Sequence, residues 1–259
     1  MKVIKYLIPI LLFSSPGLHA QRDATRDMLE IAAAGLSDSS GPESRYFVLK
    51  GRNAYFFRQY KEALEYAGNA MKLDDGNKDA YVLAADAYAA LGKDKRALKY
   101  YRKAAALDGD DPVLLYHLAL SNMKLGHNVA AMENLDRAIE IEPDNNAFYL
   151  LRGEAKMAVG IFATAIQDFE VVLELNPGDE EAIIKTGVCL REIGNYAESI
   201  EELSKAVSAN QGNADAFLER GKTYLRAFNK NKACEDFRKA VELGSREAGK
   251  LLESNCGSN

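Results

Sequence analysis

Few residues of this chain are of the types that catalyse reactions or bind metal ions. Beyond the first twenty residues there are two histidines, His117 and His127, and three cysteines, Cys189, Cys234 and Cys256. Nucleophilic catalysis needs a serine or cysteine beside an oriented histidine base, and zinc sites need clustered cysteines and histidines. No CxxC pair occurs. We therefore expect no catalytic centre, no metal site and no cofactor.

An acidic run, Asp108-Gly109-Asp110-Asp111, superficially resembles a calcium-binding loop. A calcium loop alternates its carboxylates and closes with a glutamate, but Ala119 stands at the closing position here. The glycines are dispersed along the chain and form no phosphate-binding loop. We expect the acidic run to be a turn whose side chains cap the following helix.

Small residues recur with a period of 34. Three series of six positions follow this stride, and sixteen of the eighteen residues are Gly or Ala. The series are Gly51, Ala85, Ala119, Gly153, Gly187, Gly221; Ala63, Ala97, Ala131, Ala165, Ser199, Ala233; and Ala70, Ala104, Ala138, Val172, Ala206, Ala240. Such self-similarity is typical of a protein built from repeated helical units.

Each period predicts two helices of about 13 residues, since large apolar residues recur at helical spacing and turn residues separate them. Gly92, Gly126, Gly160 and Gly194 mark turns inside four of the units. A small residue where two helices cross lets them approach closely, and a large residue of the partner helix fills the space. One pair cannot bury both of its faces, so the pairs must stack.

The pattern resembles the tetratricopeptide-repeat (TPR) family. Ala147-Phe-Tyr-Leu-Leu-Arg-Gly153, Ala165, Phe169 and Pro177 are similar to its signature, although Trp is absent from the chain. The resemblance implies an all-α, right-handed α-solenoid of six TPR helix pairs with a C-terminal capping helix. We expect repeats at residues 44–77, 78–111, 112–145, 146–179, 180–213 and 214–247. The end repeats depart most, with Arg58 and Phe228 at the turn glycine.

The two ends of the chain differ from the repeats. Lys2 and Lys5 precede an apolar stretch, residues 6–13, and Ala20 stands at a cleavage-like position. This layout predicts a signal peptide at residues 1–20, the alternative being a retained anchor. Residues 21–43 are expected to form an N-terminal helix and a flexible linker, and residues 248–259 a capping helix and tail. We expect an exported protein, periplasmic or else secreted or surface-associated.

The charge of the chain disfavours some partners. Without its first twenty residues the chain has 31 Lys and Arg against 38 Asp and Glu, a net charge of −7. Nucleic acid and anionic lipid both need a positive field. We therefore expect a protein or peptide partner, no nucleic acid, and no membrane insertion once the leader is removed, with homo-oligomers left open.

The family resemblance also implies where a partner binds. In TPR proteins the first helices line a concave groove that takes a peptide or a helix. Carried onto the central repeats, the groove positions are Tyr116, Leu120, Met123, Leu150, Glu154, Met157, Ile184, Val188 and Arg191. Their largely apolar character suits an amphipathic segment. The alternative is that these residues pack internally or beneath the N-terminal helix.

A disulfide between Cys234 and Cys256 is expected from their places in the repeats. Cys234 falls on the last second helix, and Cys256 ends the capping helix that should run back along it. The spacing also resembles paired cysteines at the ends of other exported bacterial TPR proteins. Such a bridge stabilises by about 3 kcal/mol on the chain-entropy model, and it leaves Cys189 a buried thiol. The alternative is three unpaired thiols.

Two functions agree with these expectations. The first is a non-enzymatic protein–protein interaction scaffold of the bacterial cell envelope that binds a peptide or helix in the TPR groove. The second is a chaperone-like holder of exported or outer-membrane proteins. One stoichiometric complex would favour the scaffold, and many weak clients would favour the holder. Hydrolytic turnover would instead indicate an enzyme.

Export gives a direct prediction. Protein isolated from its native host should have the intact mass of a chain that begins at Gln21, because signal peptidase removes the segment up to Ala20. A product that keeps its first twenty residues would contradict both the localisation and the expectation of an oxidising compartment.

Overall fold

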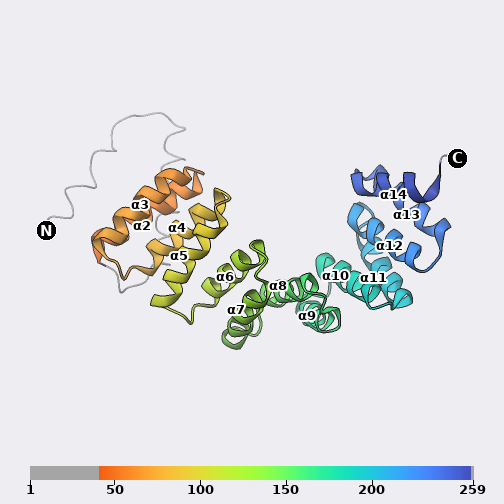
Figure 1. Cartoon of the computed structure of the whole chain (residues 1–259), viewed down its shortest axis with the longest axis horizontal. Coiled ribbons are helices and arrows are strands. Elements are labelled where there is room, and N and C mark those ends of the chain that lie inside the picture. Colours follow the sequence, from red (N-terminus) through yellow and green to blue (C-terminus); the bar gives the residue numbers. More distant parts are fainter. Residues whose placement is uncertain (1–40, 258–259) are drawn as a thin grey trace, which may run out of the picture. The chain divides into compact units, whose positions relative to one another are not determined.

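The computed structural model describes residues 41–257, which form thirteen helices and no strand. In order they are α2 (Pro42–Phe56), α3 (Tyr60–Leu73), α4 (Lys78–Ala90), α5 (Asp94–Leu107), α6 (Pro112–Lys124), α7 (Asn128–Ile141), α8 (Asn146–Ala158), α9 (Phe162–Leu175), α10 (Glu180–Glu192), α11 (Tyr196–Ala209), α12 (Ala214–Arg226), α13 (Lys230–Glu242) and α14 (Arg246–Cys256) (Figure 1). The expected leader and N-terminal helix lie outside the described residues. None of the described helices is long and apolar enough to cross a membrane.

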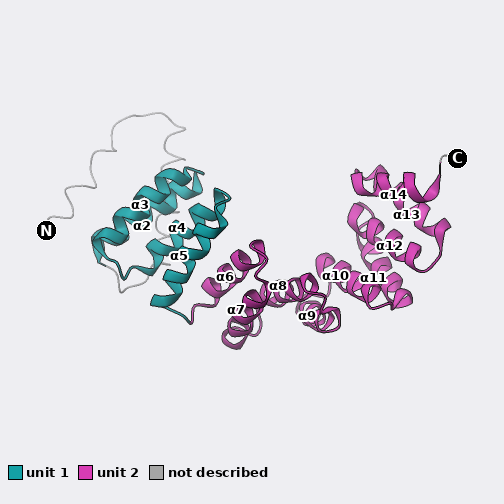
Figure 2. Ribbon diagram, viewed as in Figure 1, with its two compact units in different colours: residues 1–109 teal, residues 110–259 magenta. Residues whose placement is uncertain are grey.

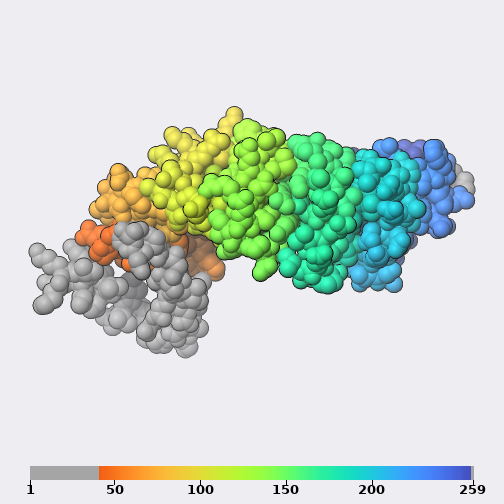
Figure 3. All heavy atoms as spheres, turned by 90° about the horizontal axis from the view of Figure 1, so that it is seen from below, coloured from red at the N-terminus to blue at the C-terminus, as the bar shows by residue number. Residues whose placement is uncertain are grey.

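The helices pack as consecutive pairs within two compact units, residues 1–109 and 110–259, here called unit 1 and unit 2 (Figure 2). Unit 1 contains the pairs α2/α3 and α4/α5, and α3 packs on α4. Unit 2 contains α6/α7, α8/α9, α10/α11 and α12/α13, each second helix packing on the next first helix, with α14 against α13. Figure 3 shows the successive pairs of unit 2, from green to blue, in direct contact. The expected all-α helical-repeat solenoid is confirmed, while the repeat boundaries remain a prediction.

Side-chain caps start the first helix of five consecutive pairs. At each of these positions an Asn or Asp side chain accepts a hydrogen bond from a backbone N–H in the first turn of the helix, which has no partner inside the helix. The capping residues are Asn77, Asp111, Asn145, Asp179 and Asn213. The acidic run at residues 108–111 is therefore a capping turn, as the sequence predicts.

Left-handed residues end the first helices. Gly92, Gly126, Gly160 and Gly194 all have positive φ, which glycine adopts without steric cost. At the same place in the α2–α3 and α12–α13 turns, Arg58 has φ 60° and Phe228 has φ 58°. The two departures anticipated from the sequence thus keep the turn conformation at a cost of about 1–2 kcal/mol each.

Glycines on the first helices of unit 2 make room for large side chains of the second helices. A Cβ on Gly153 would lie 2.5 Å from Cε1 of Phe169, and one on Gly221 would lie 2.6 Å from Cε1 of Phe237. Both distances are far below van der Waals contact, so any larger residue would push the helices apart. Phe169 and Phe237 are each fully buried as a result.

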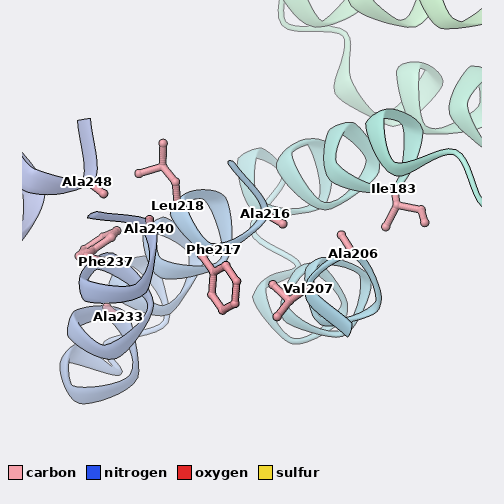
Figure 4. Packing of buried hydrophobic residues seen from close by; sticks show 10 residues of the cluster. All are labelled: Ile183, Ala206, Val207, Ala216, Phe217, Leu218, Ala233, Phe237, Ala240 and Ala248. Atoms are coloured by element: carbon pink, nitrogen blue, oxygen red, sulfur yellow. The ribbon is translucent and has the colours of Figure 1, made fainter. Parts of the chain in front are cut away.

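The core of the last pairs joins four helices. Phe217 of α12 extends toward Val207 of α11 (Figure 4), and both belong to a buried cluster that also includes Phe237 of α13 and Ala248 of α14. Leu251 and Leu252 of α14 pack against this cluster and stay partly buried. The apolar face of α14 therefore covers α13, which is the arrangement a capping helix requires.

A cysteine of the last helix pair lies at bonding distance from a cysteine of α14. Sγ of Cys234 on α13 is 1.99 Å from Sγ of Cys256 at the end of α14, and the two Cα atoms are 5.8 Å apart. Cys189 is buried in α10 and unbonded. Burial raises the pKa of its thiol to about 12, so almost none of it is the reactive thiolate at neutral pH.

Peptide mapping without reductant should therefore recover one linked peptide pair containing Cys234 and Cys256. Cys189 should resist iodoacetamide in the folded protein and react after denaturation, because only the exposed thiolate is nucleophilic. Reduction of the native protein provides the control, since it should make the partly exposed Cys256 open to alkylation and leave Cys189 protected. A bridge to Cys189, or rapid labelling of it before denaturation, would contradict this pairing.

Candidate partner-binding surface

The nine groove residues expected from the family resemblance come from three first helices of unit 2. They are Tyr116, Leu120 and Met123 on α6; Leu150, Glu154 and Met157 on α8; and Ile184, Val188 and Arg191 on α10. All nine side chains are partly buried, so each keeps some surface open to solvent. We call this set the first-helix surface.

Part of the first-helix surface also supports the core. Leu150, Tyr149 and Met157 pack against a buried cluster that contains Phe169 and Val172 of α9. Ile184 packs in the same way against the cluster of the last pairs. Leu150, Met157 and Ile184 thus contact the core and also keep part of their surface exposed, while partner binding at these residues stays a prediction.

Ion pairs cross between neighbouring first helices at this surface. Glu154 of α8 lies 2.6 Å from Lys185 of α10, joining its Oε1 to the lysine Nζ. Arg191 of α10 donates to Glu219 of α12 at 2.6 Å. The sequence predicts Glu154 and Arg191 at this surface but not their partners, since Lys185 and Glu219 are not at the positions that the family uses for its groove.

The same pattern continues to the C-terminal helix. Lys222 of α12 lies 2.7 Å from Glu219 on its own helix and 2.7 Å from Glu247 of α14. Each first helix from α8 to α12 is thus tied to the following first helix or to α14 by a charged contact. In these ion pairs, each charged side chain that lies beside the apolar residues of the first-helix surface has a partner of opposite charge.

The electrostatic environment keeps the ionisable groups in their usual charge states. Burial lowers the pKa of Lys185, but the hydrogen bonds and charges of Glu154 and Glu181 outweigh it and leave that pKa raised. Burial raises the pKa of Tyr116, and the charges of Glu154 and Glu181 add to the rise. Lys185 therefore stays charged and Tyr116 neutral at neutral pH, which suits binding better than proton transfer.

A second polar network, which sequence analysis did not identify, lies between first and second helices. Arg152 of α8 contacts Asp168 of α9 at 2.6 Å and Asp136 of α7 at 2.7 Å. Asp168 is 3% exposed, so its charge depends on these contacts and on Lys156 at 2.8 Å.

The last pair repeats this network. Arg220 of α12 donates to both carboxylate oxygens of Asp236 of α13 at 2.8 Å, and to Ser204 of α11 at 3.1 Å. Its pKa is raised chiefly by the hydrogen bonds to Asp236. An arginine sixteen residues before an aspartate, occurring twice at two repeat periods apart, was the signal in the sequence.

The α10/α11 pair, which lies between the α8/α9 and α12/α13 pairs, lacks this arginine–aspartate contact. Thr186 of α10 occupies the repeat position of Arg152 and Arg220, and its buried hydroxyl has no hydrogen-bond partner. Elsewhere in the described residues, no group of three or more His, Cys, Asp and Glu side chains is placed to hold a metal ion.

Two family models match the chain. The tetratricopeptide-repeat model matches residues 116–180 and 187–248, and a model for subunit 3 of the anaphase-promoting complex, or cyclosome, matches residues 58–138. No curated protein matches the chain in sequence.

Solved structures show a similar fold. YrrB, described as a TPR protein with an unusual peptide-binding site, has a TM-score of 0.59 and 22% identity over 73% of this chain and 97% of its own. MamA from Desulfovibrio magneticus RS-1 has a TM-score of 0.61 and 22% identity over 64% of this chain and 94% of its own. PilF of Pseudomonas aeruginosa has a TM-score of 0.65 and 18% identity over 90% of this chain and 99% of its own. At these identities the likeness is one of fold alone.

The arginine network yields a stability prediction. Arg220→Met should lower the free energy of unfolding by about 3 kcal/mol, because it leaves the buried carboxylate of Asp236 without its partner. Urea denaturation followed by circular dichroism measures the loss.

Two further variants make this test specific. Arg238→Met, at an exposed position on the same helix as Asp236, should change stability by less than about 0.5 kcal/mol. Adding Asp236→Leu to Arg220→Met should restore most of the loss, since the unpaired charge is then gone. Equal effects of Arg220→Met and Arg238→Met would show that the contact is not holding α12 to α13.

Proposed function

The chain belongs to the tetratricopeptide-repeat family, and we propose that it is a non-enzymatic scaffold of the bacterial cell envelope that holds a segment of a partner protein on its first-helix surface. Proteins of this family generally act as interaction scaffolds without catalysis. The observation that carries the proposal is that nine side chains from three consecutive first helices stay partly exposed on one unit. Apolar side chains that stay partly open to solvent on consecutive helices support an interaction surface.

The chemistry of the surface favours a helical segment as its ligand. An extended peptide brings unpaired backbone groups that need polar partners, whereas an amphipathic helix satisfies its own. The charged side chains here are already engaged, as in the Glu154–Lys185 and Arg191–Glu219 pairs. A partner helix can therefore place its apolar face on Leu120, Leu150 and Val188 and its polar residues beside the ion pairs.

The envelope location rests on two features. The first is the leader-like segment from Lys2 to Ala20. The second is the pair Cys234–Cys256 at bonding distance, since disulfides persist in oxidising compartments outside the cytoplasm. The intact-mass and peptide-mapping measurements test these features independently of the partner.

A chaperone-like holder of exported or outer-membrane proteins is the second candidate. Met123 and Met157 favour it, because methionine side chains adapt to differently shaped apolar ligands. The two functions differ in the number of partners, so the experiment must report how many proteins contact the surface.

Site-specific photo-crosslinking in cells makes that distinction. A photoreactive residue placed in turn at Leu120, Leu150 and Val188 should capture the same single protein, because the three positions lie on α6, α8 and α10 of one surface. Gln167, exposed on α9, is the matched control and should capture little. Many products of different mass would favour the holder, and capture from Gln167 alone would place binding on another face.

Substitutions then test the energy of binding. Leu120→Asp with Val188→Asp should lower affinity for the captured protein by about 2 kcal/mol or more, as expected for central anchors. These positions are preferred because Leu150 and Met157 also pack against buried residues. The melting temperature of the double variant is the control, and a large drop would mean that the loss of binding reports unfolding.

A further inference from the structure

The turn between α12 and α13 holds an aromatic residue in a costly position. Phe228 has φ 58°, and its side chain is 96% exposed. Glycine stands at this place in four other turns, where it adopts positive φ without strain. The chain therefore carries both a strained backbone and an exposed aromatic ring here. Neither cost is offset by packing, since so exposed a ring has almost no contact with the rest of the protein.

The surroundings of Phe228 are strongly basic although the chain as a whole is acidic. Residues 220–234 contain five Lys and Arg and no Asp or Glu. Arg220 and Lys222 are engaged in ion pairs, but Arg226, Lys230 and Lys232 are exposed and form no ion pair within the described residues. We call Arg226, Phe228, Lys230 and Lys232 the basic–aromatic tip.

The tip is also well anchored. Asn229 accepts a hydrogen bond from the backbone N–H of Lys232 and so caps α13, while its own N–H donates to the carbonyl of Tyr224 at 2.8 Å. The amine of Lys232 lies 5.5 Å from the ring centre of Tyr224. Phe228 thus projects from a defined turn rather than from a loose segment.

From this combination we propose that the basic–aromatic tip docks on the surface of an anionic lipid bilayer. The aromatic ring enters the interface, and the three cations contact lipid phosphates on either side of it. The contact is peripheral and is separate from the first-helix surface, so it adds a function to the proposed scaffold without depending on it.

A lipid surface fits the tip better than a protein does. A bilayer interface accepts a single projecting ring without a matching cavity, and it offers a phosphate to each flexible cation wherever that cation reaches. An acidic protein would need both a pocket for Phe228 and carboxylates fixed opposite three separate side chains. The tip is a projecting turn, which suits a soft, uniformly charged partner.

The net charge of the chain does not oppose this contact. Exposed charges are screened beyond a Debye length of about 8 Å at physiological ionic strength. The carboxylates that make the chain acidic as a whole therefore act weakly at the tip. Nearby, the three exposed cations Arg226, Lys230 and Lys232 outnumber one exposed carboxylate, Glu235, so the local charge stays positive. The prediction that anionic partners are disfavoured rests on the total charge, whereas the proposed contact rests on this local cluster.

A comparable turn occurs in unit 1. Between α2 and α3, Phe56 and Phe57 are 62% and 52% exposed, and Arg58 beside them has φ 60°. An exposed aromatic residue, a nearby cation and a left-handed residue that is not glycine thus recur in the two turns that lack the glycine. The α4–α5 turn keeps Gly92 and has Lys93 and Lys95 without an aromatic, so it provides a matched control.

Vesicle co-sedimentation of the chain tests the proposal. It should bind vesicles of equimolar phosphatidylglycerol and phosphatidylcholine and bind phosphatidylcholine alone much more weakly. Phe228→Gly should reduce binding to the anionic vesicles by about tenfold or more, because it removes the ring that enters the bilayer interface. Its melting temperature should stay equal or rise, since glycine relieves the left-handed strain. The chain used begins at Gln21, the predicted mature N-terminus, so the apolar stretch at residues 6–13 does not contribute to the binding that is measured.

Charge variants separate the two parts of the tip. Lys230→Gln with Lys232→Gln should lower binding to anionic vesicles by about an order of magnitude or more and flatten its salt dependence. Lys93→Gln with Lys95→Gln removes the same charge from the control turn and should leave binding unchanged. Equal losses from both pairs would overturn the proposal, because total charge would then explain the binding.

Fluorescence reports the position of the ring directly. The chain has no tryptophan, so Phe228→Trp introduces a single indole whose emission should shift to the blue when anionic vesicles are added. An unshifted emission, or Phe228→Gly binding as well as the parent chain, would overturn the proposal. If Phe228→Gly instead turns an oligomer into a monomer with no change in vesicle binding, the tip contacts a second copy and the lipid proposal is wrong.

Discussion

The close approach of first and second helices is the constraint on which unit 2 depends. At Gly153, Gly187 and Gly221 even one added carbon would lie within 2.6 Å of a buried side chain on the second helix. Because these contacts repeat with the period of the chain, each pair presents the same face to the next pair. The first helices α6, α8 and α10 consequently bring their partly exposed residues to one surface, which no single pair could form.

The period in the sequence predicts most of this arrangement, because helix spacing and small residues are local properties of the chain. It identified the helical pairs, the turn at Phe228 and the pairing of Cys234 with Cys256. The ion pairs were missed, since they depend on how far one helix is turned toward the next. Glu154 reaches Lys185, and Arg152 reaches Asp136 and Asp168, on different sides of the same helix. A repeat pattern shows that these residues exist but does not say which of them meet.

The buried arginine contacts add definition to the packing more than stability. Removing the carboxylate of Asp168 or Asp236 from water costs free energy, and the attraction to the arginine roughly offsets that desolvation penalty. What the contact does provide is direction, because the planar guanidinium of Arg220 meets both oxygens of one carboxylate in a single geometry. Thr186 lacks such a partner in the α10/α11 pair, where the ion pairs of Lys185 and Arg191 at the first-helix surface join α10 to α8 and α12 instead.

The strained turn at Phe228 persists because α13 is held in place from several directions. Phe237 fills the space left by Gly221, Asp236 is gripped by Arg220, and Cys234 lies at bonding distance from Cys256 of α14. A left-handed conformation at a residue other than glycine survives only where its surroundings determine the backbone. The contacts that secure the end of the helical stack therefore also allow an aromatic side chain to remain exposed at the α12–α13 turn, where glycine would have been the less costly residue.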